Sequence, residues 1–201
     1  LDLRTNNPVL HRDYRECDAW RELVLVRINE LRPALLVMAS ASYYDAEPTF
    51  RAAALGRLVS RLRPNVGALV VLRDTPRPGF NVPSCLARAA WRGADGSTTC
   101  TYARESEDVW HRSQMQAERA ALGTDGGVHY VDLSSSFCSS EQCEVIRGPL
   151  VLFSDAHHLT ASFAETLARP LQVALQDALG STNPLFAIGT VDKAGLMKSA
   201  R

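Results

Sequence analysis

The sequence predicts an α/β fold with a mainly parallel sheet and helices on both faces. Amphipathic helical patterns alternate with short apolar runs along the chain, which is typical of βαβ units. The apolar runs are continuous, as expected of strands buried on both faces. The chain has 201 residues, of which 46% are hydrophobic, and this is enough for one sizeable core.

Four segments have the pattern of strands. In chain order they are 34–42, 65–76, 126–135 and 149–155, the last being either a short strand or an extended segment. Each is mainly apolar and is bounded by turn-forming residues. Ligand sites of open α/β sheets lie beyond the carboxyl ends of the strands, so we expect functional residues just after these runs.

Four segments have the pattern of amphipathic helices, namely 17–33, 49–64, 105–123 and 159–180. In the first, apolar residues recur at helical spacing; they are Trp20, Leu23, Val24, Ile28 and Leu31.

The last helical segment carries two further signals. Thr160 is placed to cap its start, and Pro170 is expected to kink it or to end its first part. The stretch 77–104 is predicted to be irregular, and 181–201 lacks periodicity. We therefore expect one domain over 1–180 and a C-terminal tail over 181–201.

Composition excludes several classes of protein. Lys and Arg number 22, as do Asp and Glu, so the formal charge is zero and no nucleic-acid partner is indicated. The composition is unlike that of collagen, a coiled coil or a disordered chain. No run of 18 apolar residues occurs, so no membrane-spanning helix is predicted.

The five cysteines favour local disulfides. Cys85 and Cys100 lie close in the sequence, as do Cys138 and Cys143, and neither spacing is that of a common zinc site. Two disulfides formed in an oxidising compartment are the favoured interpretation, and a metal site is the alternative. Cys17 is left over, which indicates a partner outside the chain or a free thiol.

The segment after the fourth apolar run holds the strongest candidate site. Asp155, His157 and His158 lie within four residues. An Asp-x-x-His turn can place the carboxylate against the imidazole, which fixes the tautomer and leaves the other ring nitrogen free as a general base. The alternatives are a capping role for Asp155 with surface histidines, and a metal site formed by all three side chains.

The segment around these residues resembles part of a known protein family. The run CSSEQCEVIRGPLVLFSDAHHLT over 138–160 resembles the last block of SGNH-type hydrolase domains, in the form found with acyltransferase-3 membrane acyltransferases. In that group a C-x4-C loop precedes a strand and then D-x-x-H-L-[ST]. The segments 12–42 and 70–89 resemble earlier parts of the same group in the same order, so the likeness covers about 12–179.

The resemblance implies a three-layer α/β/α fold and a Ser-His-Asp triad. By motif, Asp155 is the triad acid and His158 the base, while His157 falls on a variable position. The implied activity is transfer or hydrolysis of O-acyl groups, acetyl or another short acyl, on cell-envelope carbohydrate. No cofactor is implied. The implied setting is extracytoplasmic, with tethering to a membrane acyltransferase domain outside this chain.

The chain departs from the family where the nucleophile should be. It contains no Gly-Asp-Ser, the block that carries the serine on the family's first strand. The block that supplies an Asn-Asp oxyanion donor falls on 39–42, where only backbone amides are available. We expect that the first strand and its serine lie upstream of this chain, and that Cys17 pairs with an upstream cysteine. The chain is then an enzyme only as part of a full-length acyltransferase or esterase.

Other polar and aromatic residues lie near the predicted strand ends. Six serines follow strands but none lies in a Gly-x-Ser-x-Gly elbow, so turn-forming and capping roles are favoured; they are Ser40, Ser42, Ser134, Ser135, Ser136 and Ser154. Asp74 either lines the pocket or forms a turn, and Tyr43 and Tyr44 either line the site or cover the sheet. The rival to an enzyme is a non-catalytic module of the same fold that binds acylated glycans.

Overall fold

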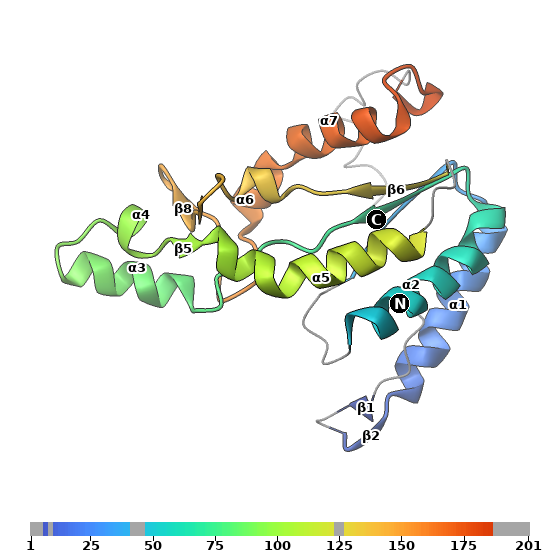
Figure 1. Ribbon diagram of the computed structural model, residues 1–201, viewed down its shortest axis with the longest axis horizontal. Helices are drawn as coiled ribbons and strands as arrows, with labels where there is room; N and C mark the ends of the chain where they lie inside the picture. Colours follow the sequence, from blue (N-terminus) through green and yellow to red (C-terminus); the bar gives the residue numbers. More distant parts are fainter. Residues whose placement is uncertain (1–5, 8–9, 41–46, 123–126, 187–201) are drawn as a thin grey trace, which may run out of the picture.

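A three-stranded parallel sheet forms the centre of the protein. The computed structural model describes residues 6–7, 10–40, 47–122 and 127–186. The strands β3 (Leu35–Ala39), β4 (Ala68–Leu72) and β6 (Val128–Val131) lie in the order β3-β4-β6, and both pairings are parallel (Figure 1). All three are shorter than the apolar runs that predicted them. A Cβ at Gly67 would lie 2.5 Å from the carbonyl oxygen of Ala34, so glycine is needed where β3 and β4 begin side by side.

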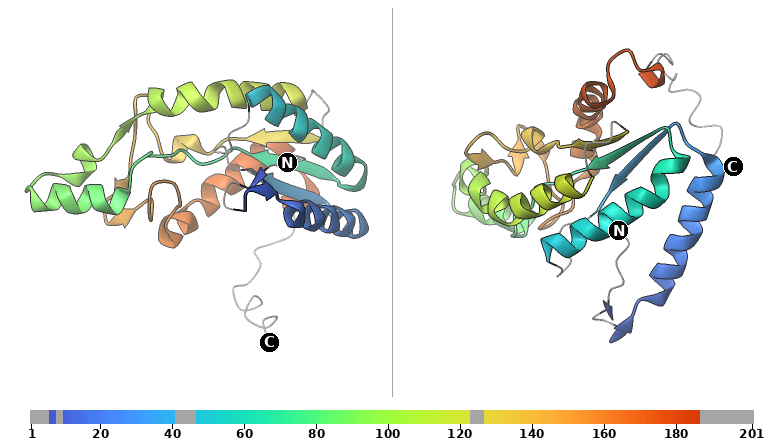
Figure 2. Two further views of the ribbon diagram at one scale, coloured as in Figure 1. Left: turned by 90° about the horizontal axis from the view of Figure 1, so that it is seen from below. Right: turned by 45° about the vertical axis from the view of Figure 1, so that its right-hand side comes forward.

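Helices cover both faces of this sheet, as predicted. The helices α2 (Pro48–Leu62) and α5 (Arg104–Leu122) pack against one another over one face, and α7 (Ala168–Leu179) lies on the other side against β6 (Figures 1 and 2). The result is the expected three-layer arrangement.

One core lies between the sheet and the helices α2 and α5. Leu69 and Val71 of β4 point into it with Leu55 and Leu58 of α2 and Leu122 of α5. Val70 of the same strand is also fully buried but points to the opposite face. A strand buried on both faces explains why the run in β4 is continuously apolar.

A second core lies beyond the carboxyl edge of the sheet. Its centre is formed by Phe137, Phe153 and Phe163, of which Phe137 and Phe163 meet edge to face at 5.3 Å between ring centroids. The Cys138–Cys143 disulfide is buried in the same cluster, and Cys100 joins it. This core supports the loop that carries the candidate site, because Phe153 and Phe163 lie on either side of that loop in the sequence.

The stretch 77–104, predicted to be irregular, contains two helices, so that prediction was wrong. They are α3 (Val82–Trp91) and α4 (Gly96–Thr99). Asn81 caps α3 by accepting a hydrogen bond from the backbone N–H of Ser84, as cap residues do. The helix is short and follows a segment rich in proline and glycine, which conceals its pattern.

The remaining strands are two residues long. The segment 149–155 adds no strand to the parallel sheet; only Leu150–Val151 is a strand, and Phe153 then forms an isolated antiparallel bridge with Leu159. These short strands form three antiparallel pairs: β1 (Asn6–Asn7) with β2 (Arg12–Asp13), β5 (Tyr102–Ala103) with β7 (Gln142–Cys143), and β8 (Ile146–Arg147) with β9 (Leu150–Val151).

The first helix, α1 (Arg15–Leu31), turns much of its apolar stripe outward. It lies beside α2, and Leu25 reaches the first core. Trp20 and Leu23 of the stripe are 64% and 70% exposed, and Leu31 is exposed too. The spacing therefore predicted the helix but not the face that is buried. The neighbouring strand β3 is an edge of the sheet.

The C-terminal helical segment is divided as Pro170 suggested. The helix α6 (Ala161–Thr166) is capped by Thr160, and α7 starts two residues after α6 ends. Gly180, which follows α7, has a positive φ of 86°, and a short 3-10 helix, Pro184–Phe186, lies beyond it. The domain boundary at 180 stays a prediction. None of the helices in the described ranges is both long and apolar enough to cross a bilayer.

Candidate active site

The loop 154–158 is fixed at both ends by backbone hydrogen bonds. Ser154 and His158 are joined through the Ser154 N–H and the His158 carbonyl oxygen at 2.8 Å. The carbonyl oxygen of Asp155 accepts a bond from the N–H of Val82 at the start of α3. Phe153, directly before the loop, is fully buried in the second core. The loop is thus a short closed turn held on a rigid base.

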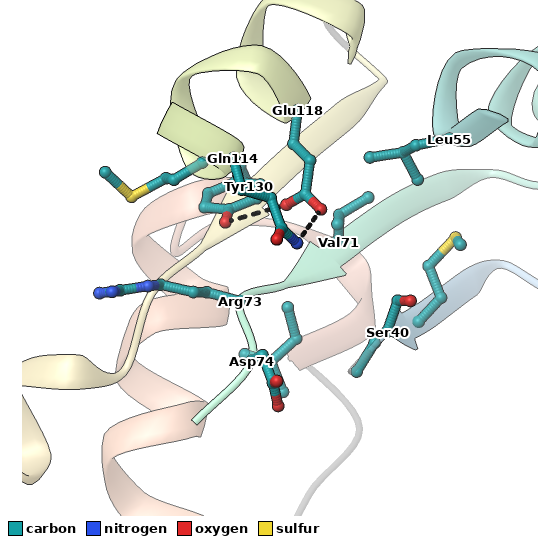
Figure 3. Close-up of a pocket in the computed structure, with 12 residues that line it drawn as sticks. Ser40, Leu55, Val71, Arg73, Asp74, Gln114, Glu118 and Tyr130 are labelled. Atoms are coloured by element: carbon teal, nitrogen blue, oxygen red, sulfur yellow. Dashed lines mark hydrogen bonds between the residues drawn. The ribbon is translucent and has the colours of Figure 1, made fainter. Parts of the chain in front are cut away.

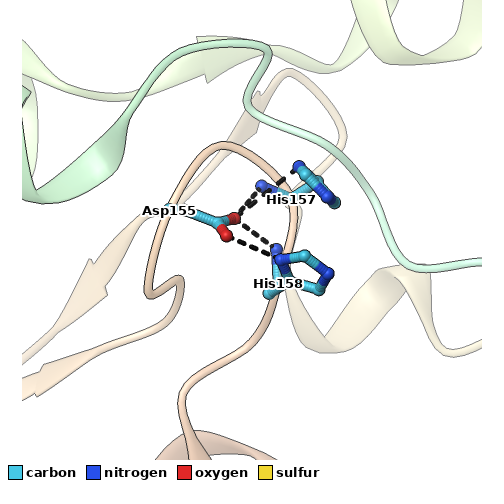
Figure 4. Close-up of side chains that lie close together, drawn as sticks. All are labelled: Asp155, His157 and His158. Atoms are coloured by element: carbon cyan, nitrogen blue, oxygen red, sulfur yellow. Dashed lines mark hydrogen bonds and ion pairs between the residues drawn. The ribbon is translucent and has the colours of Figure 1, made fainter. Parts of the chain in front are cut away.

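Asp155 and His158 form the pair that the sequence predicted. Nδ1 of His158 lies 2.6 Å from Oδ2 of Asp155, and Oδ1 of the same carboxylate accepts the backbone N–H groups of His157 and His158, each at 2.8 Å (Figure 4). With the carboxylate ionised, Nδ1 carries the proton and Nε2 is left with its lone pair. This is the arrangement that lets an imidazole act as a general base.

The carboxylate is held in its ionised form. The backbone N–H of His158, then its ring, then the backbone N–H of His157, all hold the pKa of Asp155 far below its usual range. Bonds to the charged form favour that form. The His158 side chain is 65% exposed, so its ring is open to a reacting group from solvent or from another part of the protein.

His157 belongs to the same cluster. Its Nδ1 lies 3.6 Å from Oδ1 of Asp155, and its ring centroid is 4.0 Å from that of His158. The two imidazoles therefore lie next to each other on one side of the carboxylate (Figure 4). The sequence analysis had assigned no role to this residue in the triad.

Two of the serines near the strand ends have structural partners for their hydroxyl groups. The Ser154 hydroxyl donates to the carbonyl oxygen of His158, and the Ser134 hydroxyl accepts from Arg104. Within the described part of the chain, no serine hydroxyl is hydrogen-bonded to the ring of His158. Ser42, Tyr43 and Tyr44 lie outside the described residues.

A small pocket opens at the carboxyl ends of β3 and β4 (Figure 3). Ser40, Arg73 and Asp74 line it, and its cavity volume is about 20 Å³, room for about one water molecule. Asp74 also accepts the N–H of Thr75, so it both lines the pocket and forms a turn. The segment that leaves β4 here continues to Val82, which contacts the Asp155 loop.

The sequence analysis missed a polar group, mostly buried, in the wall of this pocket. Nε2 of Gln114 donates to Oε1 of Glu118 at 2.9 Å, and the Tyr130 hydroxyl donates to Oε2 at 3.4 Å. Burial, and then the charge of Glu118, raise the pKa of Tyr130. The available signal was weak: Gln114 and Glu118 are four residues apart, on one face of a helix. Tyr130 comes from β6, and the packing of α5 on the sheet brings it to Glu118.

Both expected disulfides are present. Cys85–Cys100 ties α3 to the end of α4, and Cys138–Cys143 closes the loop before the site. Cys17 is exposed on α1 and has no disulfide partner among the described residues. The disulfides therefore brace the second core, on which the candidate site stands.

A known protein family shares this sequence pattern and fold. The family described as “SGNH domain (fused to AT3 domains)” matches residues 2–172. The chain belongs to this family. Its SGNH domain is also similar to a solved structure, the periplasmic domain of a lipopolysaccharide acetyltransferase from Salmonella ser. Paratyphi A.

That similarity is one of fold. The TM-score is 0.67 at 12% sequence identity, over 86% of this chain and 67% of the other. No curated protein matches the SGNH domain significantly. The expected family and the expected α/β fold are confirmed, and the link to AT3 domains supports a membrane acyltransferase domain as partner.

Proposed function

We propose that this SGNH domain supplies the acid and base of an O-acyl transfer reaction on cell-envelope carbohydrate. The observation that carries the proposal is the 2.6 Å contact between His158 and Asp155 on a loop closed by backbone hydrogen bonds. The similar periplasmic domain comes from a lipopolysaccharide acetyltransferase, which supports acetyl or another short acyl group and an extracytoplasmic setting. The partner is a membrane acyltransferase domain of the same full-length protein.

The chemistry requires a serine nucleophile. The sequence contains no Gly-Asp-Ser, and among the described residues no serine hydroxyl is hydrogen-bonded to the ring of His158. In the proposed reaction a serine from an upstream segment attacks the acyl carbonyl carbon while Nε2 of His158 takes its proton. Asp155 holds the ring and stabilises the imidazolium. The tetrahedral intermediate collapses, the carbon–oxygen bond to the leaving group breaks, and His158 returns the proton to that oxygen.

The second half of the reaction repeats these roles. A sugar hydroxyl or water attacks the acyl-enzyme, His158 takes its proton, and the serine leaves with a proton from His158. Transfer and hydrolysis differ only in the acceptor. The backbone of the 39–42 region is the proposed source of oxyanion donors, in place of the Asn of the family pattern; of this region, 41–42 lies outside the described residues.

The test compares this chain with a form extended upstream by about a strand, a loop and a helix. Each is given a short-chain activated ester, and acyl release and acylated protein are followed by absorbance and mass spectrometry. We expect turnover and an acyl-serine only in the extended form. Absence of both in the two forms contradicts acyl transfer, and binding of acylated glycans without turnover then becomes the better account.

A further inference from the structure

We propose that Asp155, His157 and His158 bind a divalent transition-metal ion, and that the bound ion prevents the Asp155–His158 pair from acting in catalysis. The types of ligand favour zinc. Each residue offers one ligand atom, and these atoms all lie within 4.8 Å of one another. The binding itself stands on this geometry. Its inhibitory consequence rests on the proposed function.

The spacing of the ligand atoms fits a tetrahedral ion. Two ligands each about 2.1 Å from zinc lie about 3.4 Å apart. The distance from Oδ1 of Asp155 to Nδ1 of His157 is 3.6 Å, which a small side-chain rotation adjusts. The two rings, whose planes are tilted by 42° and whose centroids are 4.0 Å apart, leave a His158 nitrogen within 4.8 Å of the other two ligand atoms (Figure 4).

The types of ligand favour zinc, and the exposure of the side chains gives the ion access. Two imidazoles and one carboxylate suit zinc and its neighbours, whereas magnesium and calcium prefer oxygen ligands alone. The side chains of His157 and His158 are 33% and 65% exposed, so an ion reaches them from solvent. Three protein ligands leave the fourth position to water.

Occupancy is incompatible with general base catalysis at His158. Ligation by Nε2 of His158 would use the lone pair that must accept the proton of the nucleophile. Ligation by Nδ1 would displace its proton and leave Nε2 as the protonated nitrogen, so in both cases no base remains at Nε2. An ion on Asp155 also uses the carboxylate that holds the His158 tautomer. The cluster is therefore an inhibitory site. His157 distinguishes it from the triad, because His157 belongs to the metal site and not to the triad.

Binding is tested on this chain by calorimetric titration with Zn²⁺ in a Cys17→Ser background, because the exposed thiol of Cys17 is itself a zinc ligand. We expect one equivalent to bind, and His157→Ala to weaken binding about tenfold or more. His11→Asn is the matched control: His11 is exposed with a φ of 50°, which asparagine tolerates. His157→Gln, checked by circular dichroism, guards against loss of fold. Equal affinity in the parent and both His157 variants overturns the proposal.

The inhibitory part is tested in the extended form that turns over the ester. For each variant, the rate with Zn²⁺ is divided by its own rate with a chelator. We expect strong inhibition in the parent, relief by the chelator, and weaker inhibition in His157→Gln. Activation by zinc, or full turnover with zinc bound, overturns inhibition. Lack of turnover in every form counts against the proposed function alone, because calorimetry needs no catalysis.

Discussion

Arg73 and Asp132, which follow the neighbouring strands β4 and β6, form an ion pair across the carboxyl edge of the sheet. Nη1 of Arg73 lies 3.1 Å from Oδ2 of Asp132, and the arginine side chain is 6% exposed. Oδ1 of Asp132 also accepts the N–H of Ser134. One carboxylate therefore joins the ends of two strands to the loop that leads into the second core.

This ion pair predicts a loss of stability in acid. Burial raises the pKa of Asp132, but the Ser134 N–H and the Arg73 charge outweigh it, so the net pKa is lowered. A carboxyl group with a lowered pKa in the folded state stabilises the fold above its unfolded pKa of about 3.9. The contribution is lost as pH falls through the folded-state pKa.

Asp132→Asn tests this effect. At neutral pH it should lower the free energy of unfolding by about 1.5–3 kcal/mol, because it leaves a buried guanidinium without its carboxylate. Urea unfolding of both proteins from neutral pH down to about pH 3 should show the difference shrinking as the parent carboxyl is protonated. A difference that stays constant over that range contradicts the account.

The Cys85–Cys100 disulfide is predicted to stabilise the second core. It closes a loop with a sequence separation of 15, for which the chain-entropy model gives about 3 kcal/mol. Replacing both cysteines by alanine should lower the denaturation midpoint in non-reducing buffer. Cys17→Ser, at an exposed cysteine, is the control and should leave the midpoint unchanged; equal midpoints for all three proteins would show that the bridge adds nothing.

Phe163 is predicted to be essential for the stability of the second core, which supports the active-site loop. It is 1% exposed and contacts Phe137, so Phe163→Ala should cost about 3–5 kcal/mol. Trp91→Ala removes an even larger aromatic side chain that is 85% exposed, and it should change stability by at most about 0.5 kcal/mol. Comparable losses in thermal unfolding of the two variants would mean that the second core is wrongly placed.

The outward stripe of α1 predicts self-association of this chain. Trp20 and Leu23 are exposed together on one helix, beside a sheet whose edge strand β3 has an exposed Val37. Apolar patches and free sheet edges promote association. Leu23→Lys should lower the sedimentation-derived association constant, whereas Trp91→Lys, at an exposed residue of α3, should not. A parent chain that sediments as a monomer at high concentration is the opposing result.

Much of the fold could be predicted because its signals are local. The Thr160 cap and the break near Pro170 depend on neighbouring residues. The continuous apolar run of β4 indicates by itself that the strand is buried on both faces. The burial of α1 could not be predicted, because Leu25 and Leu23 are equally apolar and tertiary packing alone decides which is covered. The short helix α3 was missed for lack of length.

The same distinction holds for the site. Asp155 and His158 are three residues apart, so a turn brings them together. Arg73 and Asp132 are 59 residues apart, and only the register of β4 with β6 places them side by side. Contacts of that kind depend on the order and register of the strands, and the apolar pattern of the sequence specifies neither.

The most direct test of the central claim is kcat/KM for a short-chain activated ester, measured in the upstream-extended form for the parent, His158→Ala, Asp155→Asn and His11→Asn. The account predicts a fall of about 10⁴-fold for Asp155→Asn, a loss at least as large for His158→Ala, and no change for the exposed His11. Turnover that survives loss of His158 would contradict the assignment of Asp155 and His158 as the acid–base pair.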